Sequence, residues 1–136
     1  MSLPRLSLVV AGLVFLGLGT YLFYAPETIG RLTGATRLPP TLLTELRAMY
    51  GGLQIGLGVY FFVAASRSRW VRSALAAQVA AFSGMAAGRV VAMVLAREYS
   101  RFFLGLAAIE LLGALLGAAG LRRARELMEL NYSRRP

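Results

Sequence analysis

The sequence predicts an all-α fold: an integral membrane four-helix bundle with antiparallel up-down topology. Hydrophobic residues make up 57% of the 136-residue chain, against about 45–50% in soluble domains, and the mean hydropathy is +0.63. A bilayer core of about 30 Å requires roughly 20 apolar residues per helix. Four stretches reach that length, at residues 6–25, 42–65, 71–96 and 102–121, and we predict one domain over residues 1–136.

The first stretch has an alternative interpretation as a secretory signal peptide. Its apolar run is about twice as long as the apolar region of such a peptide. No small-residue cleavage site follows it before Pro26 and Glu27. We therefore expect this stretch to be the first membrane-spanning helix.

The links between the stretches differ in length and composition. The first link, residues 26–41, is the longest, and its glycines and prolines interrupt helix formation. At its end we expect Pro40 and Thr41 to begin the second helix, with Thr41 as the N-cap. The other links, residues 66–70 and 97–101, are so short that the helices they join must be antiparallel neighbours.

Arginines are distributed unequally over the two ends of the predicted helices, and all 15 basic residues are Arg. The end with the chain termini carries nine: Arg5, Arg67, Arg69, Arg72, Arg122, Arg123, Arg125, Arg134 and Arg135. The other end carries four: Arg31, Arg37, Arg97 and Arg101. The positive-inside rule then predicts that both termini are cytoplasmic.

Two further features fit this orientation. Trp70 stands beside arginines and is expected to be an interfacial anchor on the cytoplasmic side. Residues 122–136 form a basic tail in which apolar residues recur at helical spacing among Arg and Glu. We expect this amphipathic tail to lie along anionic lipid headgroups.

Three charged residues fall well inside the predicted spans: Arg47, Arg89 and Glu110. At a rise of ~1.5 Å per residue they lie ~9, ~12 and ~13 Å from the non-cytoplasmic ends of their helices. Charges near mid-bilayer cost at least about 2.5–3.5 kcal/mol, so they usually face protein or water. Arg89 and Glu110 are equidistant from the turn that joins the third and fourth helices, which predicts an ion pair.

The neighbours of these charges on each helix are small, aromatic or amide residues, as expected of inward faces. At 100° per residue the faces are Arg47, Tyr50, Gly51, Gln54 and Gly58 in the second helix; Gln78, Phe82, Met85 and Arg89 in the third; and Phe103, Glu110, Gly113, Ala114 and Gly117 in the fourth.

Two arginines and one glutamate leave a surplus of one positive charge. Three explanations are open: another acid, Glu27 or Glu45, lies beside these arginines; Arg47 extends outward to water; or an anionic ligand neutralises the surplus charge.

Glu45 stands in the first turn of the second helix, where it complements the helix dipole. Tyr21, near the end of the first helix, adds a hydroxyl to such a pocket. The alternative to a pocket is a buried polar cluster that fixes helix register and binds no ligand.

Several function classes have little support. The chain has no Cys and no His, so it offers no such ligand for zinc, an iron–sulfur cluster or haem, and we expect no metal and no cofactor. We expect no nucleic-acid partner, because membrane topology accounts for the arginines. Catalysis is supported weakly, because Ser83 has no acid or base near its stripe except Arg89.

Three glycine motifs predict close contacts between helices: Gly52 with Gly56, Gly84 with Gly88, and Gly113 with Gly117. Packing inside one chain is the simpler interpretation. The alternative is a homo-oligomer, or docking onto a larger membrane complex.

The run Glu45–Gly58, ELRAMYGGLQIGLG, together with Gly88-Arg89 and the later run IELLG, resembles the small bacterial membrane proteins of the domain-of-unknown-function 4345 family. The resemblance covers about residues 8–121 and rests mainly on the R-A-x-Y-G-G core. That family is more distantly similar to DoxX-like four-helix membrane proteins. The resemblance implies a bacterial inner-membrane protein. It also supports the view that the charged and polar residues of these three runs act together in one site, but it implies no activity.

We therefore hypothesise a polar pocket in the outer half of the bundle that binds a lipid-like or anionic amphipathic small molecule. Arg47 would bind the anion, and Tyr50 and Gln54 would orient it. The candidate ligand-binding residues are Arg47, Tyr50, Gln54, Arg89, Glu110 and Tyr21. The alternative function is an accessory or scaffolding subunit that docks onto membrane partners through its glycine-rich helix faces.

Overall fold

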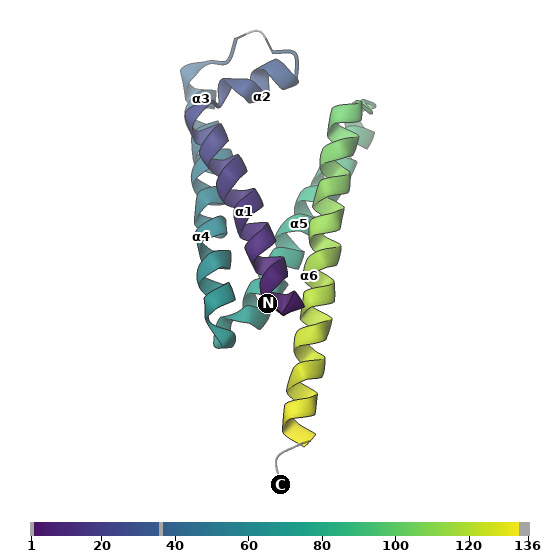
Figure 1. The fold of residues 1–136 in the computed structure, drawn as a ribbon. Helices are drawn as coiled ribbons and strands as arrows, with labels where there is room; N and C mark the ends of the chain where they lie inside the picture. Colours follow the sequence, from purple (N-terminus) through teal and green to yellow (C-terminus); the bar gives the residue numbers. More distant parts are fainter. Residues whose placement is uncertain (1, 36, 134–136) are drawn as a thin grey trace. The chain divides into compact units, whose positions relative to one another are not determined.

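The computed structural model describes residues 2–35 and 37–133, and every regular element in these ranges is helical (Figure 1). The predicted all-α class is confirmed. In chain order the elements are α1 (Leu3–Tyr24), α2 (Glu27–Leu32), α3 (Pro40–Leu46), the π-helical turn η1 (Arg47–Gly52), α4 (Leu53–Ser66), α5 (Ser68–Ala96) and α6 (Arg101–Ser133).

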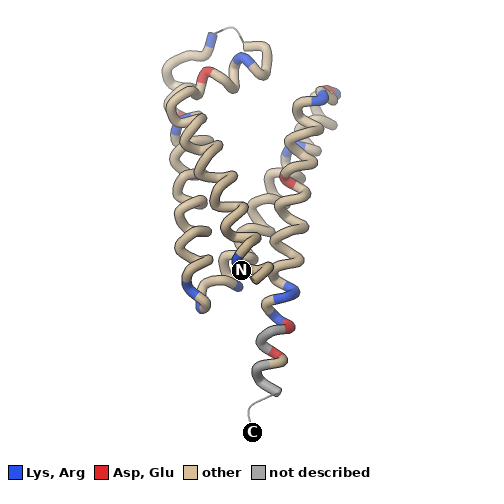
Figure 2. Tube along the Cα trace, viewed as in Figure 1, with Lys and Arg blue, Asp and Glu red and all other residues tan. Residues whose placement is uncertain are grey.

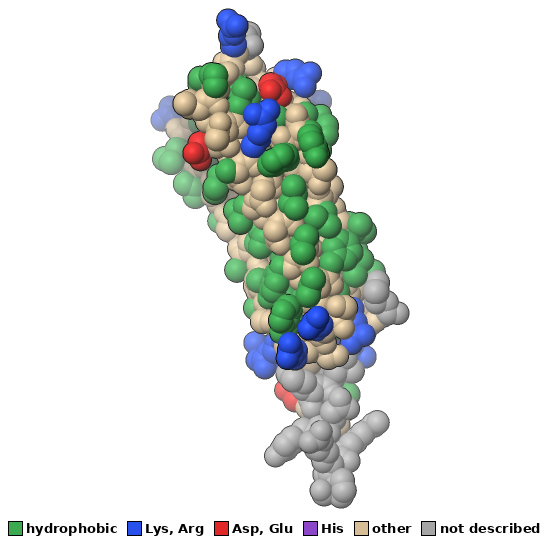
Figure 3. All heavy atoms as spheres, turned by 90° about the vertical axis from the view of Figure 1, so that its left-hand side faces the viewer, with side chains coloured by type: hydrophobic (Ala, Val, Ile, Leu, Met, Phe, Trp, Pro, Cys, Tyr) green, Lys and Arg blue, Asp and Glu red, His purple; other side chains and the backbone are tan. Residues whose placement is uncertain are grey.

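Four helical segments of the described chain are long and apolar enough to cross a membrane. They are Leu3–Tyr24, Pro40–Ser66, Ser68–Ala96 and Arg101–Glu126. Each contains most of one predicted span and begins slightly earlier than predicted. The face shown in Figure 3 carries hydrophobic side chains along its middle, with arginines gathered toward its ends. This is the distribution expected of a chain that crosses a bilayer.

The described helices form two compact units. The α1–α4 unit is Val9–Val63 and holds most of α1 and most of α4, together with α2, α3 and η1. The α5–α6 unit is Met1–Leu8 with Ala64–Pro136 and holds the first turns of α1 with α5 and α6.

In the α1–α4 unit, α1 and α4 run antiparallel and approach each other closely at glycines. A Cβ built on Gly58 would lie 2.6 Å from Cγ of Leu16 and 2.8 Å from its backbone nitrogen. A Cβ on Gly51 of η1, directly before α4, would lie 2.9 Å from the Cα of Phe23. No larger side chain fits at these distances, so the two backbones are nearly in contact, as in small-residue seams between membrane helices.

The first link is more regular than the sequence predicted. Pro26 precedes the short helix α2, which has Glu27 in its first turn. The second span begins with Pro39 as the N-cap and Pro40 inside the first turn of α3. The prediction of Thr41 as the N-cap is therefore wrong. A proline is tolerated at the first helical position because the N–H that it lacks would have no helical partner there.

The segment Arg47–Gly52 forms a π-helical turn between α3 and α4. The N–H of Leu53 donates to the carbonyl of Ala48, five residues earlier. Single π turns inside helices are rare and are often found at functional sites. The wider turn changes the predicted face of this span: Gly51 and Gln54 are buried, whereas Tyr50 is 46% exposed.

In the α5–α6 unit, the two long helices form the antiparallel hairpin that the short link predicts. The link contains Arg97, which has a left-handed φ of 53° and caps the end of α5. A Cβ on Gly113 would lie 2.6 Å from the ring of Phe82, and a Cβ on Gly117 would lie 3.2 Å from the amide of Gln78. These contacts confirm that the predicted faces of the third and fourth spans meet.

The basic segment after the fourth span continues α6. The helix runs unbroken from Arg101 to Ser133, so the helical spacing predicted for residues 122–133 is present. Residues 134–136 lie outside the described residues. The position of this tail along lipid headgroups stays a prediction.

The close approach of α1 and α4 makes a testable prediction. Gly58→Ala should lower the stability of the protein by about 1–3 kcal/mol, because the new Cβ overlaps Leu16 and the backbone must shift. Gly56→Ala is the matched control: a Cβ there has no described atom within 4 Å, and alanine is the better helix former. Thermal unfolding in detergent, followed by circular dichroism, measures both. Equal Tm values for the two variants would contradict the seam.

Candidate functional site

Arg89 of α5 and Glu110 of α6 form the predicted ion pair. The Nε of Arg89 donates to Oε2 of Glu110 at 3.0 Å, and its Nη2 donates to Oε1 of the same carboxylate. The side chain of Glu110 is 9% exposed and that of Arg89 is 24% exposed. Two parallel hydrogen bonds between a guanidinium and a carboxylate are the strongest form of this contact. The positive charge of Arg89 and the negative charge of Glu110 therefore neutralise each other within the α5–α6 unit.

A second buried polar contact lies deeper in the same unit. The Oγ of Ser7 donates to Oε1 of Gln78 at 3.1 Å, and Nε2 of Gln78 donates to the carbonyl of Gly113 at 3.0 Å. Gln78 is 1% exposed and Ser7 is fully buried. The sequence placed Gln78 on the face of Arg89 but did not identify Ser7, because a single serine in an apolar run carries no signal of its partner.

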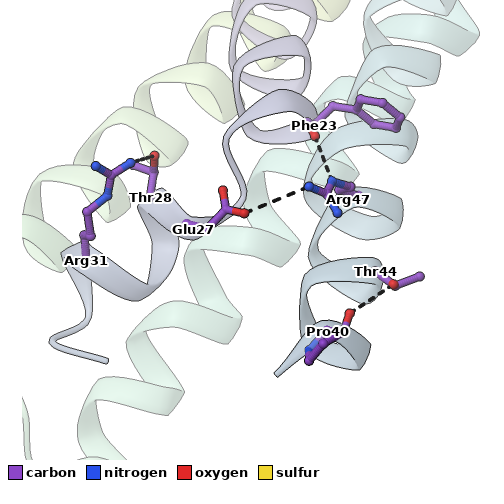
Figure 4. A network of polar contacts seen from close by, with 7 residues as sticks. All are labelled: Phe23, Glu27, Thr28, Arg31, Pro40, Thr44 and Arg47. Atoms are coloured by element: carbon purple, nitrogen blue, oxygen red, sulfur yellow. Dashed lines mark hydrogen bonds and ion pairs between the residues drawn. The ribbon is translucent and has the colours of Figure 1, made fainter. Parts of the chain in front are cut away.

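Arg47, in the α1–α4 unit, binds the end of α1. Its Nε donates to the carbonyl of Phe23 at 3.3 Å, and its Nη2 lies 4.0 Å from Oε1 of Glu27 (Figure 4). The last carbonyls of a helix have no donor within that helix, and a cation near them also favours the helix dipole. Glu27 was one of two acids considered as counter-charges for Arg47, and the structure brings it into place through α2.

Tyr21 connects α1 to α2 in the same region. Its hydroxyl lies 3.2 Å from Oγ1 of Thr28, and Nη2 of Arg31 donates to that Oγ1 at 3.3 Å. Figure 4 shows Thr28 and Arg31 on α2, with Glu27 pointing toward Arg47. We call the residues Tyr21, Glu27, Thr28, Arg31 and Arg47 the α1-end cluster. The sequence pattern identified Tyr21 and Arg47 and named Glu27 as a possible counter-charge. The short helix α2, which supplies Glu27, Thr28 and Arg31, was not predicted.

Gln54 lies next to the seam between α1 and α4. The residue is 9% exposed, and its Oε1 is buried with no hydrogen-bond partner among the described residues. Because a buried carbonyl oxygen without a donor is costly, this position is suited to a donor that comes from outside the described structure.

The predicted site residues are therefore divided between the two units. Tyr21, Arg47, Tyr50 and Gln54 belong to the α1–α4 unit, and Arg89 with Glu110 belongs to the α5–α6 unit. Arg47 and Arg89 each have an acidic partner within their own unit, Glu27 and Glu110. The described residues contain no group of three side chains suited to hold a metal ion.

The sequence profile described as Domain of unknown function (DUF4345) matches residues 3–121. The chain belongs to the DUF4345 family. The resemblance predicted from the R-A-x-Y-G-G core is confirmed, and in the structure that core forms the π turn of this DUF4345 chain. Comparisons with curated proteins and with solved structures give no match. The similarity to DoxX-like proteins stays a prediction.

The ion pair of the DUF4345 chain gives a prediction on stability. Arg89→Met should cost about 3–5 kcal/mol, because it leaves a buried carboxylate without its partner. The double variant Arg89→Met with Glu110→Met should recover most of that loss, because it buries no charge. Glu126→Gln, which breaks the exposed pair with Arg123, should change stability by less than about 1 kcal/mol. Unfolding in detergent measures all three, and a double variant as unstable as the single one would contradict the role of the pair.

Proposed function

We propose that this DUF4345 chain is a membrane protein that binds an anionic, lipid-like molecule and holds its headgroup at the α1-end cluster. The observation that carries the proposal is the guanidinium of Arg47. Phe23 occupies its Nε and Glu27 meets its Nη2 only at 4.0 Å, while the side chain is 43% exposed. Within the described residues no further acceptor binds this guanidinium, so donors remain for an anion.

The charge of the α1-end cluster favours an anionic ligand. The cluster contains two arginines, Arg31 and Arg47, and one acid, Glu27, which leaves a surplus of one positive charge. Glu27 lies against Arg47, whereas Arg31 binds Thr28 (Figure 4). A guanidinium presents paired N–H donors that match a phosphate or a carboxylate. Glu27 is itself 54% exposed, so an anion competes with an exposed carboxylate rather than with a buried one.

Hydroxyl and amide groups are available beside the arginines. Tyr21 and Thr28 each carry a hydroxyl that can also bind an oxygen of the headgroup. Tyr50 is exposed within η1, and we propose that its hydroxyl orients the ligand. Gln54 offers the unpartnered Oε1 to a hydroxyl or N–H of the ligand.

Arg89 and Glu110 have a different place in this proposal. They form a neutral pair inside the α5–α6 hairpin. In this proposal the pair stabilises the contact between α5 and α6, and Arg47 binds the anion. We further propose that the protein lies in a bacterial inner membrane with both termini in the cytoplasm, as the arginine distribution predicts. The α1-end cluster then lies at the outer leaflet.

The test places a fluorescent reporter at this cluster. In a Trp70→Phe background, Tyr24→Trp puts the only tryptophan at the end of α1, where Tyr24 is 79% exposed. The variant is placed in phosphatidylcholine nanodiscs that contain brominated phosphatidylglycerol, brominated fatty acid or brominated phosphatidylcholine. We expect stronger quenching by an anionic probe. Arg47→Ala should lower that preference about tenfold, the loss expected for one charge-assisted hydrogen bond.

Two further variants are expected to change the lipid preference in a different way from Arg47→Ala: one should increase it, and the other is a control that should not change it. Glu27→Gln removes the competing carboxylate, so it should increase the preference for the anionic probe. Arg101→Ala removes the same charge from an exposed residue of the other unit and should leave the preference unchanged. Equal quenching by both anionic probes and by phosphatidylcholine would overturn the proposal, as would an unchanged preference in Arg47→Ala.

A role as an accessory subunit is the second candidate function, and one observation favours it. A Cβ built on Gly56, Gly84 or Gly88 has no described atom within 4 Å. The glycines of α5 are therefore not used in its contact with α6, and they leave a smooth helix surface of the kind that membrane partners use.

The subunit role predicts that the α5 glycines hold a partner. Gly84→Leu with Gly88→Leu should release the chain from any complex that elutes after mild-detergent extraction, because leucines keep two backbones apart. Gly105→Leu, another glycine with open space but outside the three motifs, is the control and should leave the elution volume unchanged. A sharp monomer peak of the unaltered chain, with no second protein, contradicts this candidate.

A further inference from the structure

Three chain segments meet at one end of the α5–α6 unit, and each carries arginine. The Nη2 of Arg5, near the start of α1, donates to Oγ of Ser68, the first residue of α5, at 2.9 Å. A Cβ on Gly120 of α6 would lie 3.4 Å from the Cα of Pro4. The basic part of α6 follows Gly120 directly, so its arginines begin where α6 meets α1. Figure 2 shows basic residues near the N-terminus and along this part of α6.

Trp70 lies among the arginines at the start of α5. The Cζ of Arg67 is 5.6 Å from the centroid of the indole ring, and the Cζ of Arg69 is 5.5 Å from it. Both are cation–π distances. These contacts hold two guanidiniums beside one apolar ring, and indole rings favour the headgroup level of a bilayer because one edge of the ring is polar.

Carboxylates do not balance these arginines. The three segments contain Arg5, Arg67, Arg69, Arg72, Arg122, Arg123 and Arg125. In the described residues only Arg123 of this set forms an ion pair, with Glu126 at 2.8 Å. Like charges gathered at one end of a fold repel each other, so an anion that reaches several of them stabilises the folded state. Phosphate fits best, because its oxygens match the paired donors of guanidinium groups.

We propose that this end of the α5–α6 unit, which we call the Trp70 cluster, binds the headgroup of an anionic phospholipid. Arg67 and Arg69 hold the phosphate beside the ring of Trp70, and Arg5 extends the site from α1. The cluster lies at the ends of three helices that are long and apolar enough to cross a membrane, so its phosphate ligand is a lipid of the bilayer. The site is separate from the α1-end cluster, because it uses other residues and another unit.

The only tryptophan of the chain makes the test specific for this site. The full chain is placed in phosphatidylcholine nanodiscs that contain equal fractions of brominated phosphatidylglycerol or of brominated phosphatidylcholine. Quenching of Trp70 then reports which lipid lies against the ring. We expect stronger quenching by phosphatidylglycerol, and a loss of that preference at high salt. Arg67→Gln and Arg69→Gln should each lower the preference about fivefold, the value for one arginine at an anionic surface.

The control is the double variant Arg97→Gln with Arg101→Gln, compared with Arg67→Gln with Arg69→Gln. Both double variants remove two positive charges from the α5–α6 hairpin, each at a different end of it. Circular dichroism checks that each variant is folded. We expect the preference to persist in the first and to disappear in the second. The proposal is overturned by equal quenching in the unaltered chain, by equal losses in both doubles, or by excess inorganic phosphate that restores the emission of Trp70. The last result would assign the site to free phosphate.

Discussion

A charge inside an apolar helix must meet a partner or water, and this requirement organises both units of the protein. In the α5–α6 hairpin, Arg89 and Glu110 stand at equal distance from the link and neutralise each other. In the α1–α4 unit, the Nε of Arg47 donates to the carbonyl of Phe23, and its Nη2 lies 4.0 Å from Glu27. In the first arrangement, two hydrogen bonds join the guanidinium directly to the carboxylate. The second uses exposed groups and leaves donors open, and this difference is the reason that we propose ligand binding at Arg47.

The polar contacts depend on helices that approach closely. Arg47 can reach the end of α1 because Gly51 leaves no side chain between the two backbones at Phe23. In the other unit, Gln78 reaches the carbonyl of Gly113 across a seam in which Gly113 and Gly117 provide the space. Small residues therefore decide where polar groups on neighbouring helices can meet. A larger residue at Gly51 or Gly113 would separate the partners as well as the helices.

Where a helix is regular, the sequence was sufficient to predict the contact. The pairing of Arg89 with Glu110 follows from equal spacing about a short link, and the α-helical period correctly grouped Gln78 with Phe82. The period was misleading at Tyr50, because a π turn wraps a different number of residues and no residue type in R-A-M-Y-G-G announces it. The helix α2 was missed because Gly30 and the prolines of this link indicate interruption, whereas the six residues after Pro26 form a short helix that includes Gly30. The partner of Arg47 at Phe23 is a backbone carbonyl, and backbone groups leave no trace in a sequence pattern.

The π turn has a consequence for comparing this chain with its relatives. It accommodates one residue more than a regular α-helix would place between the same two ends. A relative that lacks one position inside the turn would join the same two ends by a regular α-helix, so an arginine at the position of Arg47 could still reach the end of α1. The residues inside the turn, Tyr50 among them, would then face a different direction. An alignment gap at this place therefore separates chains that share the arginine from chains that also share the orientation of the tyrosine.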